Sequence, residues 1–234
     1  MTIDAALTPA DISRLPERDL SATTCVVFDV LRATSSMITA LAHGAAEIFP
    51  VKTIEEALVL RMEMPDALLG GERHGARIEG FDLGNNPFEY TALACKRIIS
   101  TTTNGTIALR ACERAGRVLV GALLNIAALR DELARAQPAD VLLVCAGTFE
   151  TFAMEDAIAA GLLASEFPRA TLTDAATAVL AVAKSFSSPL DGLLAARNGR
   201  ALADRGWRDQ IEWCAQVSRF GAIGAMDGGI IRSL

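Results

Sequence analysis

The apolar positions of the chain fall into short runs separated by longer segments in which apolar residues recur at helical spacing. The short runs, at 24–30, 47–51, 97–100, 117–121 and 141–147, predict buried strands. The longer segments predict helices over residues 35–46, 53–64, 107–116, 125–137, 155–167, from 174 onward, from 189 onward and after 206. Strands that alternate with helices in this way indicate an α/β fold, with helices layered around a mostly parallel or mixed sheet.

Local signals place several of the boundaries. Thr53 and Glu56 form a capping box that begins one helix, and Pro65 ends it; Ser188 followed by Pro189 begins another. Residues 72–90 are rich in Gly, Asn and Pro and predict a long irregular loop, a type of segment that often carries function. No repeat or low-complexity linker divides residues 1–234, so we expect a single compact unit, with two interleaved lobes as the alternative.

The composition narrows the class of protein. Subtracting 28 acidic from 22 basic side chains gives a net charge of −6, which argues against a nucleic-acid-binding protein. The sequence has no apolar run long enough for a membrane span, and residues 1–20 contain no apolar h-region, so we expect no signal peptide. Five cysteines form no C-x-x-C pair, which favours reduced thiols and a cytoplasmic location over disulfides or a zinc site. The alanine-rich, apolar composition is compatible with a homodimer.

Polar clusters follow the predicted strands, at the edge where open α/β sheets bind ligands beside helix N-termini. The first cluster contains Asp29, Arg32 and Ser35. Asp29 lies at the end of the predicted strand at 24–30, and a carboxylate there is costly without a partner. Ser35 as a helix cap, and an Asp29–Arg32 ion pair, are the structural alternatives.

Three further clusters extend the set. The loop at 72–90 contributes Glu72, Arg73, Asp82 and Asn85, with a solvated surface loop as the alternative. The turn at 101–106 contributes Thr102, Thr103, Asn104 and Thr106, which suit an anion cradle or a plain helix cap. Glu155 and Asp156 begin a helix, where acids also serve simply to complement the helix dipole.

The donor types indicate a reaction class. Carboxylate, amide and hydroxyl oxygens without a set of His or Cys favour Mg²⁺ over Zn²⁺. Arginines, threonines and helix N-termini favour a small anionic, phosphorylated substrate, and together these groups suit metal-assisted phosphate-ester hydrolysis. The sequence has no P-loop and no cysteine-phosphatase loop. The RHG motif at 73–75 superficially resembles that of histidine phosphatases, but the only other histidine, His43, lies before the motif and not after it, which argues against that class. The run VVFDV resembles aspartate-nucleophile phosphatases only weakly, because Leu31 stands where their second acid is expected.

The segments FDVLRATSS (28–36), GGERHG (70–75), GFDLGNNP (80–87), TTTNGT (101–106) and MEDA (154–157) occur in an order similar to that of the 2-phosphosulfolactate phosphatase family. The resemblance covers about residues 25–232, although Asn86 departs from the small hydroxyl residue expected before Pro87. It implies a Mg²⁺-dependent phosphatase that converts 2-phospho-3-sulfolactate and water into 3-sulfolactate and phosphate, a step toward coenzyme M.

With that activity in view, we assign roles to the candidate residues as hypotheses. The expected metal ligands are Asp29, Glu72, Asp82, Glu155 and Asp156. Anion oxygens are expected to bind Arg32, Arg73, Ser35, Thr102, Thr103, Asn104 and Thr106, with Asn85 and Asn125 orienting the substrate. Asp29 is expected to activate water or, alternatively, to act as a nucleophile that forms a phosphoenzyme. A phosphatase for another 2-phospho-hydroxy acid, and a non-catalytic anion-binding protein on the same scaffold, are the competing functions.

Overall fold

The computed structural model describes all 234 residues and forms one sheet of eleven strands. The strands are β1 (Thr2–Ala6), β2 (Thr23–Phe28), β3 (Glu47–Pro50), β4 (Leu68–Arg73), β5 (Ala76–Arg77), β6 (Arg97–Thr101), β7 (Arg117–Gly121), β8 (Asp140–Cys145), β9 (Thr171–Leu172), β10 (Gly224–Asp227) and β11 (Ile230–Ser233). Their order across the sheet is β5-β4-β6-β3-β11-β10-β7-β2-β8-β1-β9. Most neighbours are parallel, which confirms the predicted α/β class with a mostly parallel, mixed sheet.

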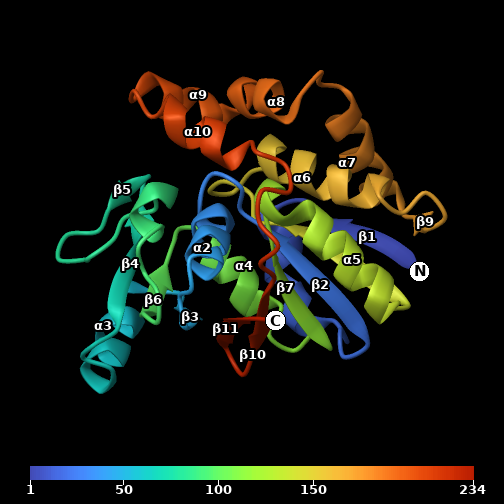
Figure 1. Cartoon of the computed structure of the whole chain (residues 1–234). Coiled ribbons are helices and arrows are strands. Elements are labelled where there is room, and N and C mark those ends of the chain that lie inside the picture. Colours follow the sequence, from blue (N-terminus) through green and yellow to red (C-terminus); the bar gives the residue numbers. More distant parts are fainter.

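Ten helices pack around the sheet in layers (Figure 1). They are α1 (Pro9–Ser13), α2 (Ala33–Ala42), α3 (Ile54–Glu63), α4 (Gly105–Ala111), α5 (Ile126–Ala136), α6 (Met154–Ser165), α7 (Asp174–Lys184), α8 (Pro189–Ala195), α9 (Arg197–Asp204) and α10 (Arg208–Cys214), with short 3₁₀ turns η1 (Leu15–Glu17), η2 (Pro87–Tyr90) and η3 (Leu123–Asn125). Taken singly, none of these helices is long and apolar enough to span a membrane, and only the sharply bent pair α7 and α8 meets those criteria together.

The apolar strand β2 divides its side chains between two cores. Cys25 and Val27 pack in the core that includes residues of α2 and α4, whereas Val26 and Phe28 pack in the core that includes residues of α5, α6 and α7. Successive strand residues point to opposite faces, so a strand covered on both sides needs a continuous apolar run. The strand predicted at 24–30 is therefore confirmed as β2, but it ends at Phe28, so Asp29 and Val30 lie beyond its end.

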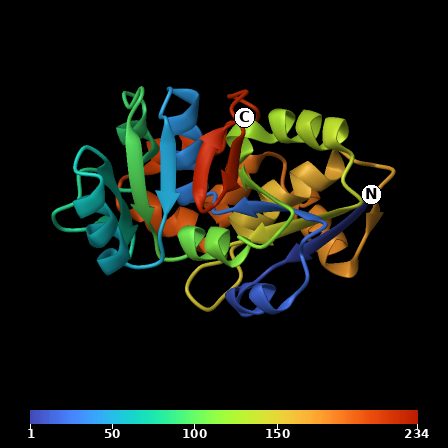
Figure 2. The ribbon, with the colours of Figure 1, turned by 90° about the horizontal axis from the view of Figure 1, so that it is seen from below.

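A hairpin divides the sheet into two parallel sets. Strand β10 pairs antiparallel with β7, and β11 pairs antiparallel with β3. One set is β4, β6 and β3, and the other is β7, β2, β8, β1 and β9. In Figure 2 the hairpin lies between the two sets; β3 and β6 stand upright in that view, whereas β1 and β2 lie across it.

The structure corrects three expectations about elements. No element was predicted before residue 20, yet β1 pairs with β8 inside the sheet. Glu72 was assigned to an irregular loop but lies on β4, and the segment predicted as one loop also contains β5 and η2. The glycine-rich tail GAIGAMDGGIIRSL (221–234) predicts at most one short strand at its end, but it forms the hairpin β10–β11.

Helices α8, α9 and α10 form a cover at one end of the strands (Figure 1). Helix α8 packs on α6, α9 packs on α8, and α10 contacts both α9 and η2. Ser188 caps α8 by accepting a hydrogen bond from the Asp191 N–H at 3.2 Å, as its sequence predicts. The cover and the strand ends face each other across the candidate site.

Candidate active site

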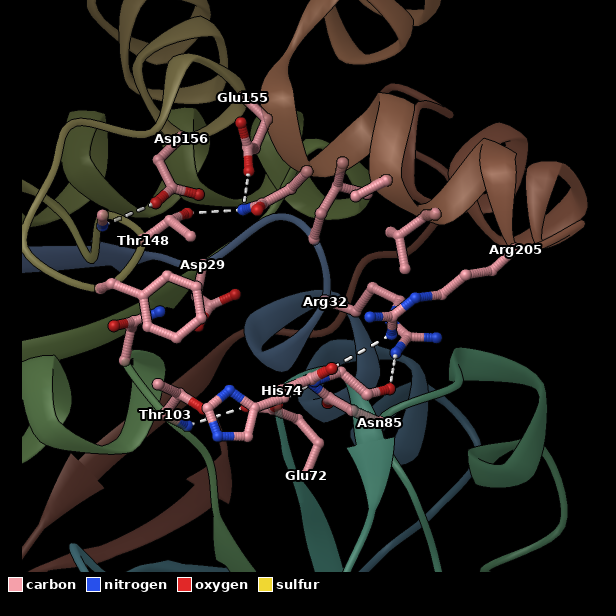
Figure 3. A pocket seen from close by; sticks show the side chains of 18 residues that line it. Asp29, Arg32, Glu72, His74, Asn85, Thr103, Thr148, Glu155, Asp156 and Arg205 are labelled. Carbon is pink, nitrogen blue, oxygen red and sulfur yellow. Dashed lines mark hydrogen bonds between the residues drawn. The ribbon is translucent and has the colours of Figure 1, made fainter.

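A cavity of about 300 Å³ lies between the cover and the ends of strands from both parallel sets (Figure 3). Its polar lining includes four carboxylates, two arginines and several amide and hydroxyl groups. The polar lining residues are Asp29, Arg32, Glu72, His74, Asn85, Thr103, Asn104, Thr148, Glu155, Asp156, Asn198 and Arg205. The remaining lining comes mostly from the backbone of Gly75 and Gly147 and from Leu31, Phe149, Ala201 and Leu202.

Asp29 is the carboxylate with the clearest pKa shift to a value in the neutral range. It lies in the turn between β2 and α2, is 8% exposed, and accepts a hydrogen bond from the Ala33 N–H at 3.2 Å. Burial raises the pKa of Asp29 to about 7, with further upward contributions from the negative charges of Glu72 and Glu155. Backbone hydrogen bonds from Ala33 and Gly105 act in the opposite direction. The carboxyl therefore changes its charge near neutral pH, as a general base requires.

Glu72 holds two loops of the cavity together. Its Oε2 accepts a hydrogen bond from the Gly75 N–H at 2.7 Å, and its Oε1 accepts one from the Thr103 N–H at 2.8 Å. Each bond satisfies a backbone donor that would otherwise lack a partner. Glu72 thus fixes the β4–β5 turn against the loop that precedes α4, and it also lines the cavity.

Asp156 and Glu155 begin α6 and are both about 2% exposed. Asp156 accepts hydrogen bonds from the Val30 N–H at 2.8 Å and from the Gly147 N–H at 3.1 Å, so it joins the loops that follow β2 and β8. Glu155 accepts one hydrogen bond from Asn198 on the cover, at 2.6 Å. Burial raises the pKa of both carboxyls, and for Asp156 the charges of Glu155 and Asp29 add to the effect. A bound cation or a bound proton would therefore stabilise these two carboxyl groups.

Thr103 offers a hydroxyl without a partner. Its Oγ1 is buried and has no hydrogen-bond partner, although its N–H is satisfied by Glu72. A buried hydroxyl without a partner is destabilising and needs an explanation, and a ligand oxygen is one. Thr102 and Thr106, by contrast, bond to each other: the hydroxyl of each accepts the N–H of the other at 3.1 Å. They shape the loop and do not line the cavity.

The structure brings together most of the residues singled out from the sequence. Eight of them line the same cavity: Asp29, Arg32, Glu72, Asn85, Thr103, Asn104, Glu155 and Asp156. Segments distant in sequence thus converge, as the parallel-sheet interpretation requires. Arg32 is 4% exposed and donates to Gln210 and to the Gly75 carbonyl.

Other candidates lie outside the cavity lining. Asp82 accepts from the Leu69 N–H at 2.8 Å and approaches Arg61 at 3.8 Å, with 41% of its side chain exposed. Arg73 donates to the Glu72 carbonyl and to the Thr101 hydroxyl.

Two more candidates serve the fold. The Ser35 hydroxyl lies inside α2 and donates to the Val30 carbonyl, so it is not the helix cap. The Asn125 side chain accepts from the Ala122 N–H and donates to the Val120 carbonyl. Neither reaches a position from which it could touch a ligand in the cavity.

Sequence reasoning missed several lining residues. Asn198 and Arg205 come from the cover, which carried no strand-end signal, and Thr148 and Phe149 follow β8 without a charged side chain. His74 was weighed only as part of an RHG motif, yet its ring lies 5.9 Å from that of Phe149. The polar residues of the segment NGRAL at 198–202 are the local signal that could have pointed to the cover.

The donor set fits a magnesium ion. No group of three His, Cys, Asp or Glu side chains forms a ready-made metal cluster. Mg²⁺ is commonly held by one or two carboxylates together with water and substrate phosphate oxygens, so such a cluster is not required. Glu155 accepts a hydrogen bond through one oxygen only, whereas both oxygens of Glu72 and of Asp156 accept one. Asp29 accepts from the backbone N–H groups of Ala33 and Gly105. Of the four carboxylates, Glu155 would therefore have the freest oxygen for the ion.

Comparison with known proteins identifies the family of the chain. Residues 10–229 match the family described as 2-phosphosulpholactate phosphatase. Proteins named probable 2-phosphosulfolactate phosphatase from Carboxydothermus hydrogenoformans and Caldanaerobacter subterraneus are each 37% identical, over 93% of this chain and 90% and 93% of theirs. One of the same name from Deinococcus radiodurans is 39% identical over 82% of this chain and 83% of its own. The chain therefore belongs to the 2-phosphosulfolactate phosphatase family, a family of phosphoric monoester hydrolases.

Proposed function

We propose that this protein is a Mg²⁺-dependent phosphatase that hydrolyses 2-phospho-3-sulfolactate to 3-sulfolactate and inorganic phosphate, the reaction type of coenzyme M biosynthesis. The observation that carries the proposal is the cavity in which buried carboxylates face arginines and a hydroxyl without a partner. That combination accommodates a divalent cation together with a multiply charged anion. Five free cysteines support a reducing compartment, and we extend the proposal to the cytoplasm.

The residues of the chain have distinct tasks in this reaction. Asp29, with its pKa near 7, takes a proton from the attacking water, whose oxygen bonds to phosphorus as the bond to the lactate oxygen breaks. The departing lactate oxygen takes up a proton from water and becomes the hydroxyl of 3-sulfolactate. The Thr103 hydroxyl donates to a phosphate oxygen, and the Arg32 guanidinium offsets the negative charge of the bound substrate. When bound, Mg²⁺ supplies Lewis-acid stabilisation of the phosphoryl oxygens. Glu72 and Asp156 keep the loops in place.

Phosphate release tests the proposal directly. We expect the purified protein with Mg²⁺ to release phosphate and 3-sulfolactate in equal amounts from 2-phosphosulfolactate. No release with Mg²⁺ present would reject the function. Turnover that persists after exhaustive chelation would reject the magnesium requirement alone. Comparison with phosphoglycolate and phospholactate distinguishes a phosphatase for another 2-phospho-hydroxy acid.

Isotope labelling separates the two roles open to Asp29. In direct attack, one turnover in ¹⁸O-water places the label in phosphate and leaves the Asp29 carboxylate unlabelled. In the phosphoenzyme route, water attacks an aspartyl phosphate, and label enters the carboxylate only if that attack occurs at its carbonyl carbon. Mass spectrometry of the Asp29 peptide, together with acid trapping of a phosphorylated intermediate, discriminates between them. Detection of either species would discard direct attack by water.

A further inference from the structure

Two arginines share one wall of the cavity, and neither forms an ion pair with an acid. Arg32 is 4% exposed, and Arg205 is an exposed residue at the end of α9. Neither takes part in any ion pair of the molecule. Figure 3 shows both guanidinium groups at one end of the cavity and Glu155 and Asp156 at the other. The cavity therefore has a positively charged end and a negatively charged end.

The two guanidinium groups are fixed by one turn and one ring. Arg32 Nη2 donates to the Gly75 carbonyl at 2.9 Å, and Arg205 Nη1 donates to the carbonyl of the preceding residue, His74, at 3.1 Å. Both also lie over the Trp207 ring, at 5.0 and 5.4 Å from its centroid. A Cβ on Gly75, whose φ is +79°, would lie 2.7 Å from Arg205 Nη1, so glycine leaves the space that this guanidinium occupies.

These contacts position the charges without neutralising them. A guanidinium has five N–H donors, and Arg205 has a protein acceptor for only one of its nitrogen atoms. Burial lowers the pKa of Arg32, whereas nearby Cys214, Glu72 and Glu89 act in the opposite direction; the neighbouring charge of Arg205 lowers this pKa further. Bringing two like charges together in a half-enclosed site is unfavourable unless an anion binds between them. A planar fork of donors suits a carboxylate or a sulfonate, which it binds with two parallel hydrogen bonds.

The substrate of the proposed function carries anions in addition to its phosphate. The phosphate must lie beside Asp29 and the unpartnered hydroxyl of Thr103, because hydrolysis takes place there. We propose that Arg205, together with Arg32, binds the anionic group of the substrate that is not transferred, and that Arg205 thereby determines which phosphate esters the enzyme accepts. The inference rests on the proposed function, and the test below separates the two.

Three substrates that differ only in their extra anions test the specificity. 2-Phosphosulfolactate has a sulfonate and a carboxylate, 2-phospholactate has the carboxylate alone, and isopropyl phosphate has neither. We expect Arg205→Gln to lower kcat/KM for 2-phosphosulfolactate by about 10- to 100-fold, the effect of losing a charge-assisted hydrogen bond, and to leave isopropyl phosphate hydrolysis unchanged. Arg205→Lys, which keeps the charge but not the fork, should lose less. The matched control is Arg208→Gln, which removes an exposed arginine paired with Glu212.

Hydrolysis of 2-phospholactate, which has the carboxylate but no sulfonate, identifies the group that Arg205 binds. If 2-phospholactate hydrolysis is also impaired, Arg205 binds the carboxylate, and if it is unaffected, Arg205 binds the sulfonate. Both outcomes support the inference. An equal loss on all three substrates, or no loss on 2-phosphosulfolactate, would overturn it.

Binding without turnover separates this inference from the proposed function. Calorimetry with 3-sulfolactate, which has no phosphate, should show affinity about 10- to 100-fold weaker for Arg205→Gln than for the wild type and for Arg208→Gln. A protein that binds 3-sulfolactate through Arg205 but releases no phosphate would disprove the phosphatase function alone. Equal affinity in the wild type and Arg205→Gln, or no binding by the wild type, would disprove the subsite.

Discussion

At the scale of single residues, the cavity concentrates negative charge where water is scarce. Asp29, Glu155 and Asp156 are all buried, and in each of them burial raises the pKa of the carboxyl. Such a cluster destabilises the fold when fully ionised, because each charge loses its hydration and faces the others. Residues that reduce stability in this way are characteristic of functional sites.

Metal-free protein should therefore lose stability as the pH rises. The pKa of Asp29 is about 7 in the folded state and about 3.8 when unfolded, so the folded state binds this proton more tightly. Its stabilising contribution is complete below about pH 4 and is lost as the pH rises through 7. In urea titrations with chelator between pH 5 and 8, we expect the wild type to lose more stability than Asp29→Asn, by at most about 1.4 kcal/mol per pH unit. Identical slopes for the two proteins would contradict the assignment.

A pair of Asp→Asn variants distinguishes Asp29 from Asp82. Both were candidate metal ligands from the sequence, but only Asp29 lines the cavity. We expect Asp29→Asn to lower kcat by at least ~100-fold, as loss of a general base does. Asp82→Asn keeps an acceptor for the Leu69 N–H and should retain its turnover. A comparable loss of turnover in both folded variants would refute the placement.

At the scale of elements, strand β4 shows how closely the backbone must approach to form the site. Gly71 has a φ of +147°, and a Cβ there would lie 1.9 Å from the Thr101 carbonyl oxygen. The glycine lets β4 pair with β6, and the next residue, Glu72, can then reach the N–H of Thr103. The position of the carboxylate thus depends on a neighbour that has no side chain.

Adding a methyl group at Gly71 should disturb both the strand and the site. We expect Gly71→Ala to lower the free energy of unfolding by about 2 kcal/mol or more, because backbone strain adds to the overlap. Gly221→Ala is the matched control: Gly221 has an ordinary φ and no atom within 4 Å of the added Cβ, so the change should stay below about 1 kcal/mol. Urea unfolding measures both. Equal effects would show that the contact with Thr101 is unimportant.

The elements differ in how well their sequences predict them. The apolar runs of β2 and β8 are buried on both faces, and the Thr53 and Ser188 caps are local signals, so all of these were predicted. Strand β1 was missed because it is short and contains Asp4, and its pairing with β8 is a long-range contact. Arg205 was missed for a similar reason, since only the packing of the cover brings it to the strand ends. Local pattern predicts elements and strand-end residues, but not side chains delivered by a distant helix.

At the scale of the whole molecule, the cavity draws on both parallel sets of strands. Glu72 and Thr103 come from the set that contains β4 and β6, whereas Asp29 and Asp156 come from the set that contains β2 and β8. The two sets meet through β10 and β11, and Ile231 of β11 is fully buried there. The homodimer expected from composition stays a prediction.

Because the hairpin joins the two sets, they should unfold together. We expect Ile231→Ala to lower stability by about 2–5 kcal/mol, as for other buried truncations of this size, and to keep a single transition. Ile230→Ala, at the half-buried neighbouring position, should cost less. Circular dichroism and tryptophan fluorescence should give superimposable unfolding curves. Two separate transitions would support independent lobes.

The place of the hairpin in the chain has a consequence for biosynthesis. Every residue that lines the cavity has been translated by position 205, but the strands that join its two sides are residues 224–233. A nascent polypeptide on the ribosome therefore holds all the catalytic groups before it can hold them together. Phosphatase activity should be detectable only after residues 224–233 have left the exit tunnel. Truncations that remove these residues should abolish the activity, although they remove no residue that lines the cavity.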